Sequence, residues 1–360
     1  MPDIVVDRAL FAVHLARVMP AVGKSAQNVL LHGVLVVFRG GELSLHAQNG
    51  EQHARSTCDA PHDADLMVLV QAVKLHEIVR SSRETDLRLE HDGDVLRVHL
   101  GSSQFELLTL DLTSYQPFPA AVTTQTMIVE GVDFARILKQ SSAAVSGEAA
   151  RYAMQGVCIA VTGPDADVQF VGTNGKCLVV ASCKTFGNTP WKQVVVPPLS
   201  LRLVPQTEGR VTLSTNGRQL VVKTANLEVA SLLVEGNYPQ YGLIIPKGSA
   251  AASYTLAPKE LTAAVRQAGV MADRETLRMR VDAREDRLEF SAQSADSGKS
   301  RVELLTRRRG LATDVFLNPV LLSEILGIII GDECELGIRS GGEPITVTTA
   351  GMLALVMPMT

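Results

Sequence analysis

Apolar positions with the spacing of one helix face recur three times along the 360-residue chain. At i, i+4 and i+7 the chain carries three stripes: Phe11, Leu15 and Val18; Phe134, Leu138 and Ser141; and Leu261, Val265 and Ala268. The stripes begin at positions 11, 134 and 261, which are 123 and 127 residues apart. A repeat of this length indicates a tandem of whole domains, because a solenoid unit is much shorter. The spacing therefore predicts three similar domains.

Each helical stripe is followed by a segment in which polar and apolar residues alternate, as in a half-buried strand. The turns after the first two segments are both Asn-Gly, at Asn49-Gly50 and Asn174-Gly175. Each third of the chain predicts a helix, two strands, a second helix and further strands. The expected helices run from a cap at Asp7 to Met19, then over 70–81 (with Val70, Val73 and Ile78 on the apolar side), 131–143, 198–204, 257–268 and 318–329. The expected strands are 29–38, 42–48, 87–91, 95–100, 104–110, 155–162, 167–171, 210–215, 219–224, 277–282, 287–292, 334–339, 344–349 and 352–357.

This order of elements predicts an α+β fold with three tandem domains, in which helices cover one face of antiparallel sheets. We expect the domains to span 1–121, 125–247 and 252–360. The linkers Pro117-Phe118-Pro119 and Pro246-Lys247-Gly248-Ser249 are short, which suits domains joined edge to edge.

Composition indicates a soluble protein of the cytoplasm. Hydrophobic residues make up 46% of the chain and charged residues 20%. No apolar run reaches the ~20 residues of a membrane span, and the first residues, MPDIVVDRAL, do not resemble a signal peptide. The five cysteines show no CxxC spacing, so we expect free buried thiols in a reducing compartment and no membrane partner.

The patterns of catalytic sites are missing or incomplete. Gly23-Lys24-Ser25 resembles the end of a phosphate-binding loop, but the glycine required five positions earlier is Val18. All eight histidines lie before residue 100, and no GxSxG motif is present. The nearest metal-ligand pair is His46 with His53, and solvated strand histidines explain it better. We therefore expect no catalytic residue, no metal and no cofactor.

Two surface features suggest binding. Basic residues fall on the predicted helices with few acids beside them, although the net charge is −4. A helix face of this kind can meet a polyanion, and a solvated face explains it equally well. The chain also ends in the apolar stretch Leu353–Met359, which either forms a last core strand or is offered to a partner.

Five segments, taken in order, resemble the bacterial sliding clamp, the β subunit of DNA polymerase III. They are Arg151–Val157 (the clamp's RYxLNG), Gly172–Leu178 (ATDGHRL), Gly236–Tyr241 (GxFPDY), its echo Pro117-Phe118-Pro119, and the ending Val356–Met359. The resemblance runs over the whole chain. It implies a head-to-tail homodimer that closes a ring around duplex DNA, with helices inside and sheets outside.

The resemblance also implies roles for individual residues. Sequence-independent contacts to DNA would come from Arg17, Lys24, Lys74, Arg80, Arg136, Lys139, Arg151, Tyr152, Arg202 and Arg266. A cleft for peptides of the polymerase III catalytic subunit, the clamp loader and other clamp-binding proteins would comprise Met154, Thr173, Gly175, Lys176, Cys177, Leu178, Pro239, Leu243, Ile244, Val356, Met357, Pro358 and Met359. The dimer joint would pair Phe105 and Leu107 with Val270 and Met271.

The chain departs from the family pattern near the expected cleft. Lys176-Cys177 stands where a His-Arg pair is usual, Gly242-Leu243 replaces a basic pair, and the chain stops at Thr360, where the family usually continues. These departures leave the peptide preference open. They also leave an alternative to the DNA clamp, a clamp paralogue that acts as a protein-interaction scaffold without being loaded on DNA.

Overall fold

A computed structural model describes residues 3–24, 28–116, 118–119, 125–147, 152–161, 167–187, 191–198, 201, 203–204, 209–339 and 342–359. The chain forms two compact units. Unit 1 comprises Met1–Ala135, Thr185–Trp191 and Leu199–Leu233, and unit 2 comprises Arg136–Lys184, Lys192–Pro198 and Val234–Thr360. The expected central domain contributes residues to both units, and the three domain boundaries stay a prediction.

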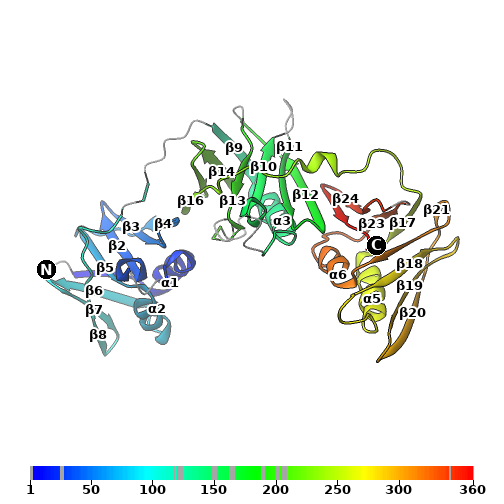
Figure 1. The fold of residues 1–360 in the computed structure, drawn as a ribbon. Coiled ribbons are helices and arrows are strands. Elements are labelled where there is room, and N and C mark those ends of the chain that lie inside the picture. Colours follow the sequence, from blue (N-terminus) through cyan, green and yellow to red (C-terminus); the bar gives the residue numbers. More distant parts are fainter. Residues whose placement is uncertain are drawn as a thin grey trace. The chain divides into compact units, whose positions relative to one another are not determined.

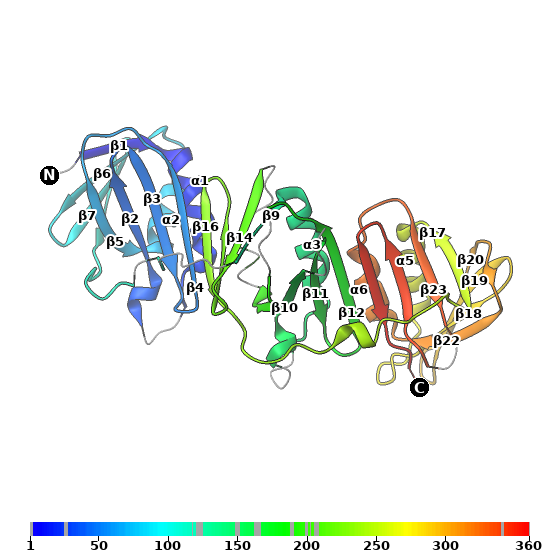
Figure 2. The same cartoon turned by 90° about the horizontal axis from the view of Figure 1, so that it is seen from above.

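Unit 1 contains two antiparallel sheets. The longer sheet has eight strands in the order β5-β2-β3-β4-β16-β15-β14-β9, and Figure 2 shows them side by side. The shorter sheet has the order β1-β6-β7-β8. The strands are β1 (Asp3–Asp7), β2 (Gly33–Arg39), β3 (Glu42–Gln48), β4 (Gln52–Asp59), β5 (Leu66–Gln71), β6 (Asp86–Asp92), β7 (Val95–Leu100), β8 (Ser103–Leu108), β9 (Gln125–Glu130), β14 (Arg210–Thr215), β15 (Gln219–Lys223) and β16 (Leu227–Leu232). The helices are α1 (Arg8–Val18) and α2 (Ala72–Ser81), with 3-10 turns η1 (Met19–Ala21) and η2 (Val29–His32).

Unit 2 repeats this plan. Its longer sheet has nine strands in the order β13-β10-β11-β12-β25-β24-β23-β17-β21, and its shorter sheet has the order β20-β19-β18-β22. The strands are β10 (Val157–Val161), β11 (Asp167–Thr173), β12 (Cys177–Lys184), β13 (Val194–Val196), β17 (Ala252–Leu256), β18 (Met279–Ala283), β19 (Arg287–Ser294), β20 (Gly298–Leu305), β21 (Arg309–Gly310), β22 (Thr313–Leu317), β23 (Cys334–Ile338), β24 (Ile345–Thr349) and β25 (Met352–Val356). The helices are α3 (Gly131–Ser142), which begins in unit 1, α5 (Pro258–Gly269) and α6 (Pro319–Gly327), with 3-10 turns η3 (Tyr152–Gln155) and η4 (Tyr241–Leu243).

The repeated helical stripes form the buried faces of α1, α3 and α5. All nine stripe residues are buried, with no more than 6% of any side chain exposed. In unit 1, α1 packs beside α2, and in unit 2, α5 packs beside α6 (Figure 1). The Asp7 carboxylate accepts a hydrogen bond from the Leu10 N–H at 2.6 Å, which fixes the start of α1 as predicted. The helical period in the sequence is therefore confirmed.

Several local predictions were wrong. Residues 29–32 form a 3-10 turn and not the start of a strand, and Val70 belongs to β5. Val73 is half exposed, because α2 buries Ala72, Leu75 and Val79. Of the expected helix at 198–204, residues 199, 200 and 202 lie outside the described residues. β12, whose residues are buried on both faces, and β16 were not predicted from the sequence.

Candidate functional sites

Most of the basic residues expected at DNA lie on helices or just after them. Lys24 follows η1 and is exposed, while Lys74 and Arg80 are exposed on α2. Lys139 is exposed on α3 and Arg266 on α5. Arg151 and Arg202 lie outside the described residues, as does the side chain of Tyr152.

Some of these cations already have intramolecular partners. The Arg136 guanidinium donates to the Ser182 carbonyl at 3.1 Å, and Lys74 Nζ lies 3.1 Å from the Glu77 carboxylate. Arg17 is half buried, with Nη1 3.5 Å from Nδ1 of His14. A phosphate must compete with these contacts, so Arg136 and Arg17 are weaker candidates for DNA binding than Lys139 and Arg266.

The exposed face of α1 differs from that of the other helices. It carries Ala9, Val13 and Ala16, and Val13 is 50% exposed. Arg8, at the start of α1, is held inside the unit because its guanidinium donates to the carbonyls of Glu84 and Val79. The outward face of α1 is thus nearly uncharged.

The apolar end of the chain forms β25, which is paired between β12 and β24 in unit 2. Within β25, Val356 is opposite both Cys177 of β12 and Ile345 of β24. Beyond β25, the Met357 N–H donates to the Lys176 carbonyl at 2.9 Å and the Met359 N–H to the Phe316 carbonyl at 2.7 Å. Backbone pairing therefore holds the last residues in place, and the methionine side chains remain available at the surface.

The turn before β12 is rigid and lies next to the tail. The Asn174 side chain accepts hydrogen bonds from the N–H groups of Lys176 and Cys177, at 2.9 and 2.8 Å. The Thr173 hydroxyl donates to the Cys177 carbonyl at 2.6 Å. Gly175 adopts a φ of 84°, which favours glycine. The Asn174-Gly175 turn is therefore held in a defined conformation next to Met357, whose N–H donates to the Lys176 carbonyl.

A segment that contains two tyrosines covers one face of the nine-stranded sheet. The Tyr238 hydroxyl donates to the Val171 carbonyl and the Tyr241 hydroxyl to the Gln169 side chain, each at 3.0 Å. The two rings pack edge to face with centroids 6.4 Å apart. Burial against this segment places Leu178 in a second small core with Tyr238. The sequence reading had not given these tyrosines a role, although Gly236–Tyr241 was among the resembling segments.

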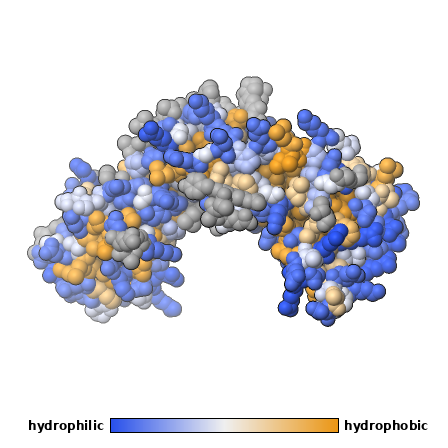
Figure 3. All heavy atoms as spheres, viewed as in Figure 1, coloured by the Kyte–Doolittle hydropathy of each residue, from blue (hydrophilic) through white to orange (hydrophobic). Residues whose placement is uncertain are grey.

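The structure separates the expected cleft residues into buried and exposed groups. Thr173, Cys177, Leu178 and Val356 are at most 5% exposed and belong to the interior. Leu243 is 79% exposed, Ile244 44% and Met357 37%. Figure 3 shows apolar side chains gathered on the visible face of unit 2. The remaining expected members, Met154, Gly175, Lys176, Pro239, Pro358 and Met359, are half-buried or exposed.

The Cys177 thiol shows how the charges lie near this surface. Burial raises its pKa to about 12, and the nearby carboxylate of Glu324 on α6 adds to the shift, while Lys176 opposes it. The thiol is therefore protonated and unreactive at neutral pH. Glu324 is exposed and acts electrostatically on Cys177, and it was not among the predicted cleft residues.

Each four-stranded sheet has two end strands, β1 and β8 in unit 1 and β20 and β22 in unit 2. Phe105 and Leu107 on β8 are half-buried, and after α5 Val270 is 74% exposed and Met271 half-buried. An open strand edge with apolar residues is a template for another strand.

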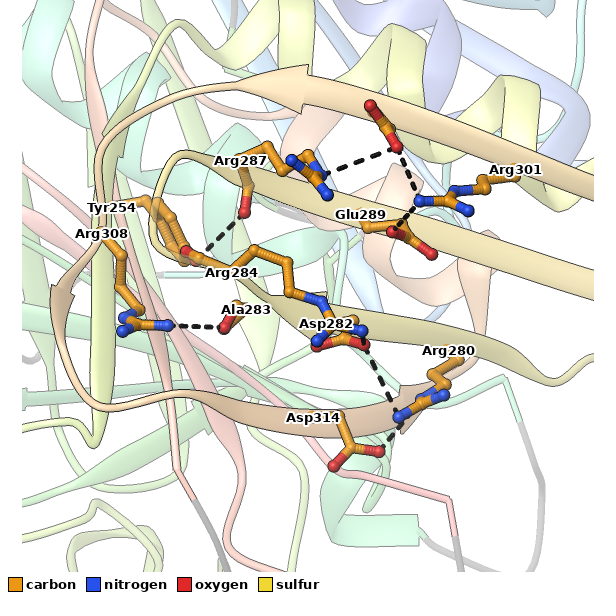
Figure 4. A network of polar contacts seen from close by, with 11 residues as sticks. Tyr254, Arg280, Asp282, Ala283, Arg284, Arg287, Glu289, Arg301, Arg308 and Asp314 are labelled. Atoms are coloured by element: carbon orange, nitrogen blue, oxygen red, sulfur yellow. Dashed lines mark hydrogen bonds and ion pairs between the residues drawn. The ribbon is translucent and has the colours of Figure 1, made fainter.

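Charged residues cover the outer face of the sheet that contains β20 (Figure 4). Arg301 on β20 lies 2.8 Å from both Glu289 and Glu303, and Arg280 lies 3.1 Å from Asp314. The Tyr254 hydroxyl donates to the Arg284 carbonyl at 2.7 Å. These pairs satisfy one another, so this face is a solvated ladder of ion pairs.

No group of three or more metal-binding side chains occurs in the part of the chain that the structure describes. None of the described helices has the length and apolar character that crossing a bilayer requires.

Repeated α+β units, helix pairs against antiparallel sheets and an apolar tail paired into a sheet define the class of clamp-type domain proteins. Residues 3–119 match the model of the DNA polymerase III beta subunit N-terminal domain, and residues 129–240 match that of its central domain. Since these matches cover more than half of the chain, it belongs to the DNA polymerase III beta subunit family.

Individual relatives agree with this assignment. The beta sliding clamp of Synechococcus elongatus is 23% identical, with 96% of each chain covered, and that of Pseudomonas putida is 22% identical, with 92% of each covered. Among solved structures, the beta subunit of Thermotoga maritima matches with a TM-score of 0.90 at 19% identity. The Pseudomonas aeruginosa clamp bound to griselimycin matches with 0.92 at 20% identity, and both cover 99% of each chain. The α+β clamp fold is therefore confirmed.

Proposed function

We propose that this protein is a DNA sliding clamp, a non-catalytic processivity factor of the cytoplasm. Two copies join head to tail into a ring around duplex DNA and tether the replicative polymerase, the clamp loader and repair proteins. The observation that carries the proposal is the family match, which extends over the N-terminal and central domains. No catalytic site is part of the proposal.

The exposed cations suit a ring that slides. Contacts to phosphate carry no sequence information, so a few of them position DNA without fixing the ring at one site. Lys24, Arg80, Lys139 and Arg266 are the exposed members of the predicted set that have no intramolecular ion pair within the described residues. Many strong phosphate contacts would slow sliding, so the nearly uncharged face of α1 is compatible with this role.

The apolar surface around Leu243, Ile244 and Met357 supports the partner-binding part of the proposal. Exposed apolar side chains on a rigid frame offer contact area for the apolar anchor residues of a short peptide. Methionine adapts its shape, which suits a surface that receives several partners in turn. Since griselimycin is bound by one of the matched clamps, it is a ready probe for this surface.

A processivity assay with the cognate polymerase and clamp loader tests the proposal. On a primed circular template we expect the clamp to lengthen the product of one binding event at least tenfold. The protein should sediment at twice the 38.6 kDa of one chain. A monomer that leaves product length unchanged would refute the proposal.

One observation favours the scaffold alternative. Arg8, Arg136 and Lys74 use their charges inside the molecule, and the outward face of α1 is apolar. Charge reversal of Lys24, Arg136 and Lys139 together separates the two functions. Loss of processivity with an intact dimer supports the DNA clamp, whereas unchanged processivity supports a scaffold that does not need DNA contacts.

A further inference from the structure

One arginine in unit 2 is held by an aromatic ring and not by a carboxylate. Arg278 directly precedes β18, and its Cζ lies 3.8 Å from the centroid of the Phe316 ring on β22. Both side chains are on the outer face of the four-stranded sheet, because Phe316 pairs with the exposed Arg280, two residues after Arg278. An aromatic ring attracts a cation without neutralising it. The contact therefore positions the guanidinium and leaves its charge unpaired.

Other arginines of this sheet differ from Arg278 in this respect. Each has a carboxylate within 3.1 Å (Figure 4); they are Arg280, Arg284, Arg287 and Arg301. Arg278 is exposed and forms neither an ion pair nor a hydrogen bond with any residue that the structure describes. A guanidinium presents a planar fork of N–H groups that matches the two oxygens of a carboxylate. Arg278 can therefore take up a carboxylate from another molecule without breaking an internal pair.

A strained loop places Arg278 at the start of β18. Leu277 has a φ of 48°, and among the described residues it is the only one other than glycine with a positive φ. A leucine in this conformation is strained, so its surroundings must hold it there. The Leu277 N–H donates to the Asp273 carbonyl at 2.8 Å, and the Asp273 carboxylate accepts the Thr276 N–H at 2.9 Å. These bonds fix the backbone that leads into Arg278.

Phe316 connects Arg278 to the apolar tail. Its ring lies against the guanidinium, and its carbonyl accepts the Met359 N–H at 2.7 Å. β22 is an end strand of its sheet, so the tail runs along an edge that no other strand of that sheet covers. A peptide with an apolar residue packed against Met359 would therefore bring its neighbouring residues within reach of Arg278, since an extended chain advances about 3.3 Å per residue.

The charges of this face favour a single carboxylate over a polyanion. Nucleic acid laid across the sheet would also meet the carboxylates of Asp314, Glu289 and Glu303 (Figure 4). These carboxylates repel phosphates at the spacing of a nucleic-acid strand. One Asp or Glu side chain can contact Arg278 alone and avoid them. The ligand that fits best is therefore an acidic residue in a short protein segment.

We propose that Arg278, held over Phe316, binds a carboxylate of the partner peptides, next to the apolar residue that packs against Met359. The inference rests on the proposed partner-binding function and adds a preference to it. Peptides with Asp or Glu beside the apolar anchor bind better than peptides with a neutral or basic residue there. A charge at the rim of an apolar contact selects among partners in this way.

Synthetic peptides test the preference. Each probe is a fluorescent peptide with blocked ends and a central Leu-Phe pair, and it carries Asp, Asn or Lys at one flanking position in turn. On the parent chain, Asp should bind about fivefold more tightly than Asn at one of these positions, and Lys more weakly than Asn. Fluorescence anisotropy gives the dissociation constants, and their Asn-to-Asp ratio at that position measures the preference.

Variants of the chain assign this ratio to Arg278. Arg278→Gln should bring the ratio close to one without changing the affinity of the Asn peptide, and Arg278→Glu should make the Lys peptide the tightest. Arg274→Gln removes an exposed cation of the same loop and is the matched control, which should keep the parent ratio. Phe316→Leu keeps the backbone hydrogen bond to Met359 and removes the ring, so it should lower the ratio part of the way.

The outcomes separate this inference from the proposed function. A ratio that persists in Arg278→Gln, or that is close to one at every flanking position in the parent, overturns the inference and leaves the clamp function standing. Binding of griselimycin without binding of any peptide also overturns it, because a carboxylate was offered at each flanking position. If Arg278→Gln instead weakens only the binding of a fluorescent single-stranded oligonucleotide, Arg278 contacts nucleic acid and the inference is wrong. If the parent binds neither griselimycin nor any peptide, the partner-binding part of the proposed function fails as well.

Discussion

Units 1 and 2 share a plan and differ in chemistry. Each has one long antiparallel sheet, one four-stranded sheet and a helix pair, α1 with α2 and α5 with α6. All eight histidines lie in unit 1. The apolar tail, the exposed Leu243 and the charged ladder of Figure 4 lie in unit 2. The first helices show the contrast most clearly, since α1 exposes Ala9 and Val13 where α5 exposes Lys259 and Arg266. Repetition fixes the buried positions, and the exposed positions are free to take different roles.

The largest expected effect tests the feature that the two units share, the buried apolar stripe of their first helices. Leu15→Ala in α1 and Leu261→Ala in α5 each remove a fully buried side chain, so each should lower the free energy of unfolding by about 3 kcal/mol. Gln267→Ala, on the exposed face of α5, should change it by no more than about 0.5 kcal/mol. Hydrogen exchange of the two units reports each loss separately. A large loss in only one unit would show that the stripes are not equivalent.

A second prediction concerns a surface that only unit 2 carries. Met357→Ala with Met359→Ala should weaken binding of griselimycin, or of a peptide from the cognate polymerase, at least tenfold by removing apolar anchors. Dimerisation should persist, because the backbone hydrogen bonds of these residues remain. Val320→Ala, an exposed apolar change on α6, is the matched control in a titration by calorimetry. Unchanged affinity in the double variant would remove the tail from the partner site.

The third prediction uses the uneven distribution of histidine. Burial lowers the pKa values of His14, His46 and His53, and that of His46 falls to about 4, with Arg55 adding to the effect of burial. A folded-state pKa below the unfolded value of 6.5 means that this stability is complete above pH 6.5 and is lost as pH falls toward 4. From pH 7 to pH 5, unit 1 should lose about 1–2 kcal/mol through His46 alone.

Urea unfolding followed by the fluorescence of Trp191, which lies in unit 1, measures this loss. His46→Asn should flatten the dependence between pH 7 and pH 5. Since unit 2 contains no histidine, it should show little change in this range. An equal loss in both units would assign the effect to carboxylates instead.

The smallest expected effect concerns the helix faces. Lys139→Ala and Arg266→Ala should each weaken binding to duplex DNA about two- to fivefold. Each should also reduce the slope of log K against log[salt] by about one. Val13→Ala on α1 should change neither quantity. Fluorescence anisotropy over a range of salt concentrations measures both the affinity and the slope for each variant. Equal effects of all three changes would show that the charged side chains on the helices do not contact DNA.

The sequence predicted the helices well because their signals are local. The buried stripe of α1 and its cap at Asp7 can be read from a dozen residues, and both are confirmed. β12 was missed because both of its faces are covered. Leu178 packs beneath Tyr238 on one side and Val179 enters the main core of unit 2 on the other, so no alternation remains. Tyr238, which covers Leu178, lies 60 positions further along the chain, and a local sequence pattern cannot encode a contact at that distance.

The candidate sites were predicted as sets of positions, without their accessibility. Resemblance named Cys177 and Leu243 together, yet one is 5% exposed and the other 79%. Likewise, Arg136 and Lys139 are both basic residues on one helix and could not be distinguished by residue type. In the structure the Arg136 guanidinium donates to a backbone carbonyl, whereas Lys139 is exposed. Burial and hydrogen bonding depend on chain segments that meet only in the fold, so residue type alone could not rank these positions.

Retention on DNA of changing topology tests the central claim most directly. The protein is loaded by its clamp loader onto nicked circular DNA, separated from free protein by gel filtration at moderate salt, and the DNA is then cut once. A ring around DNA should remain on the circle and leave within minutes of linearisation. Retention that is equal on circular and linear DNA, or no retention on either, would contradict the account.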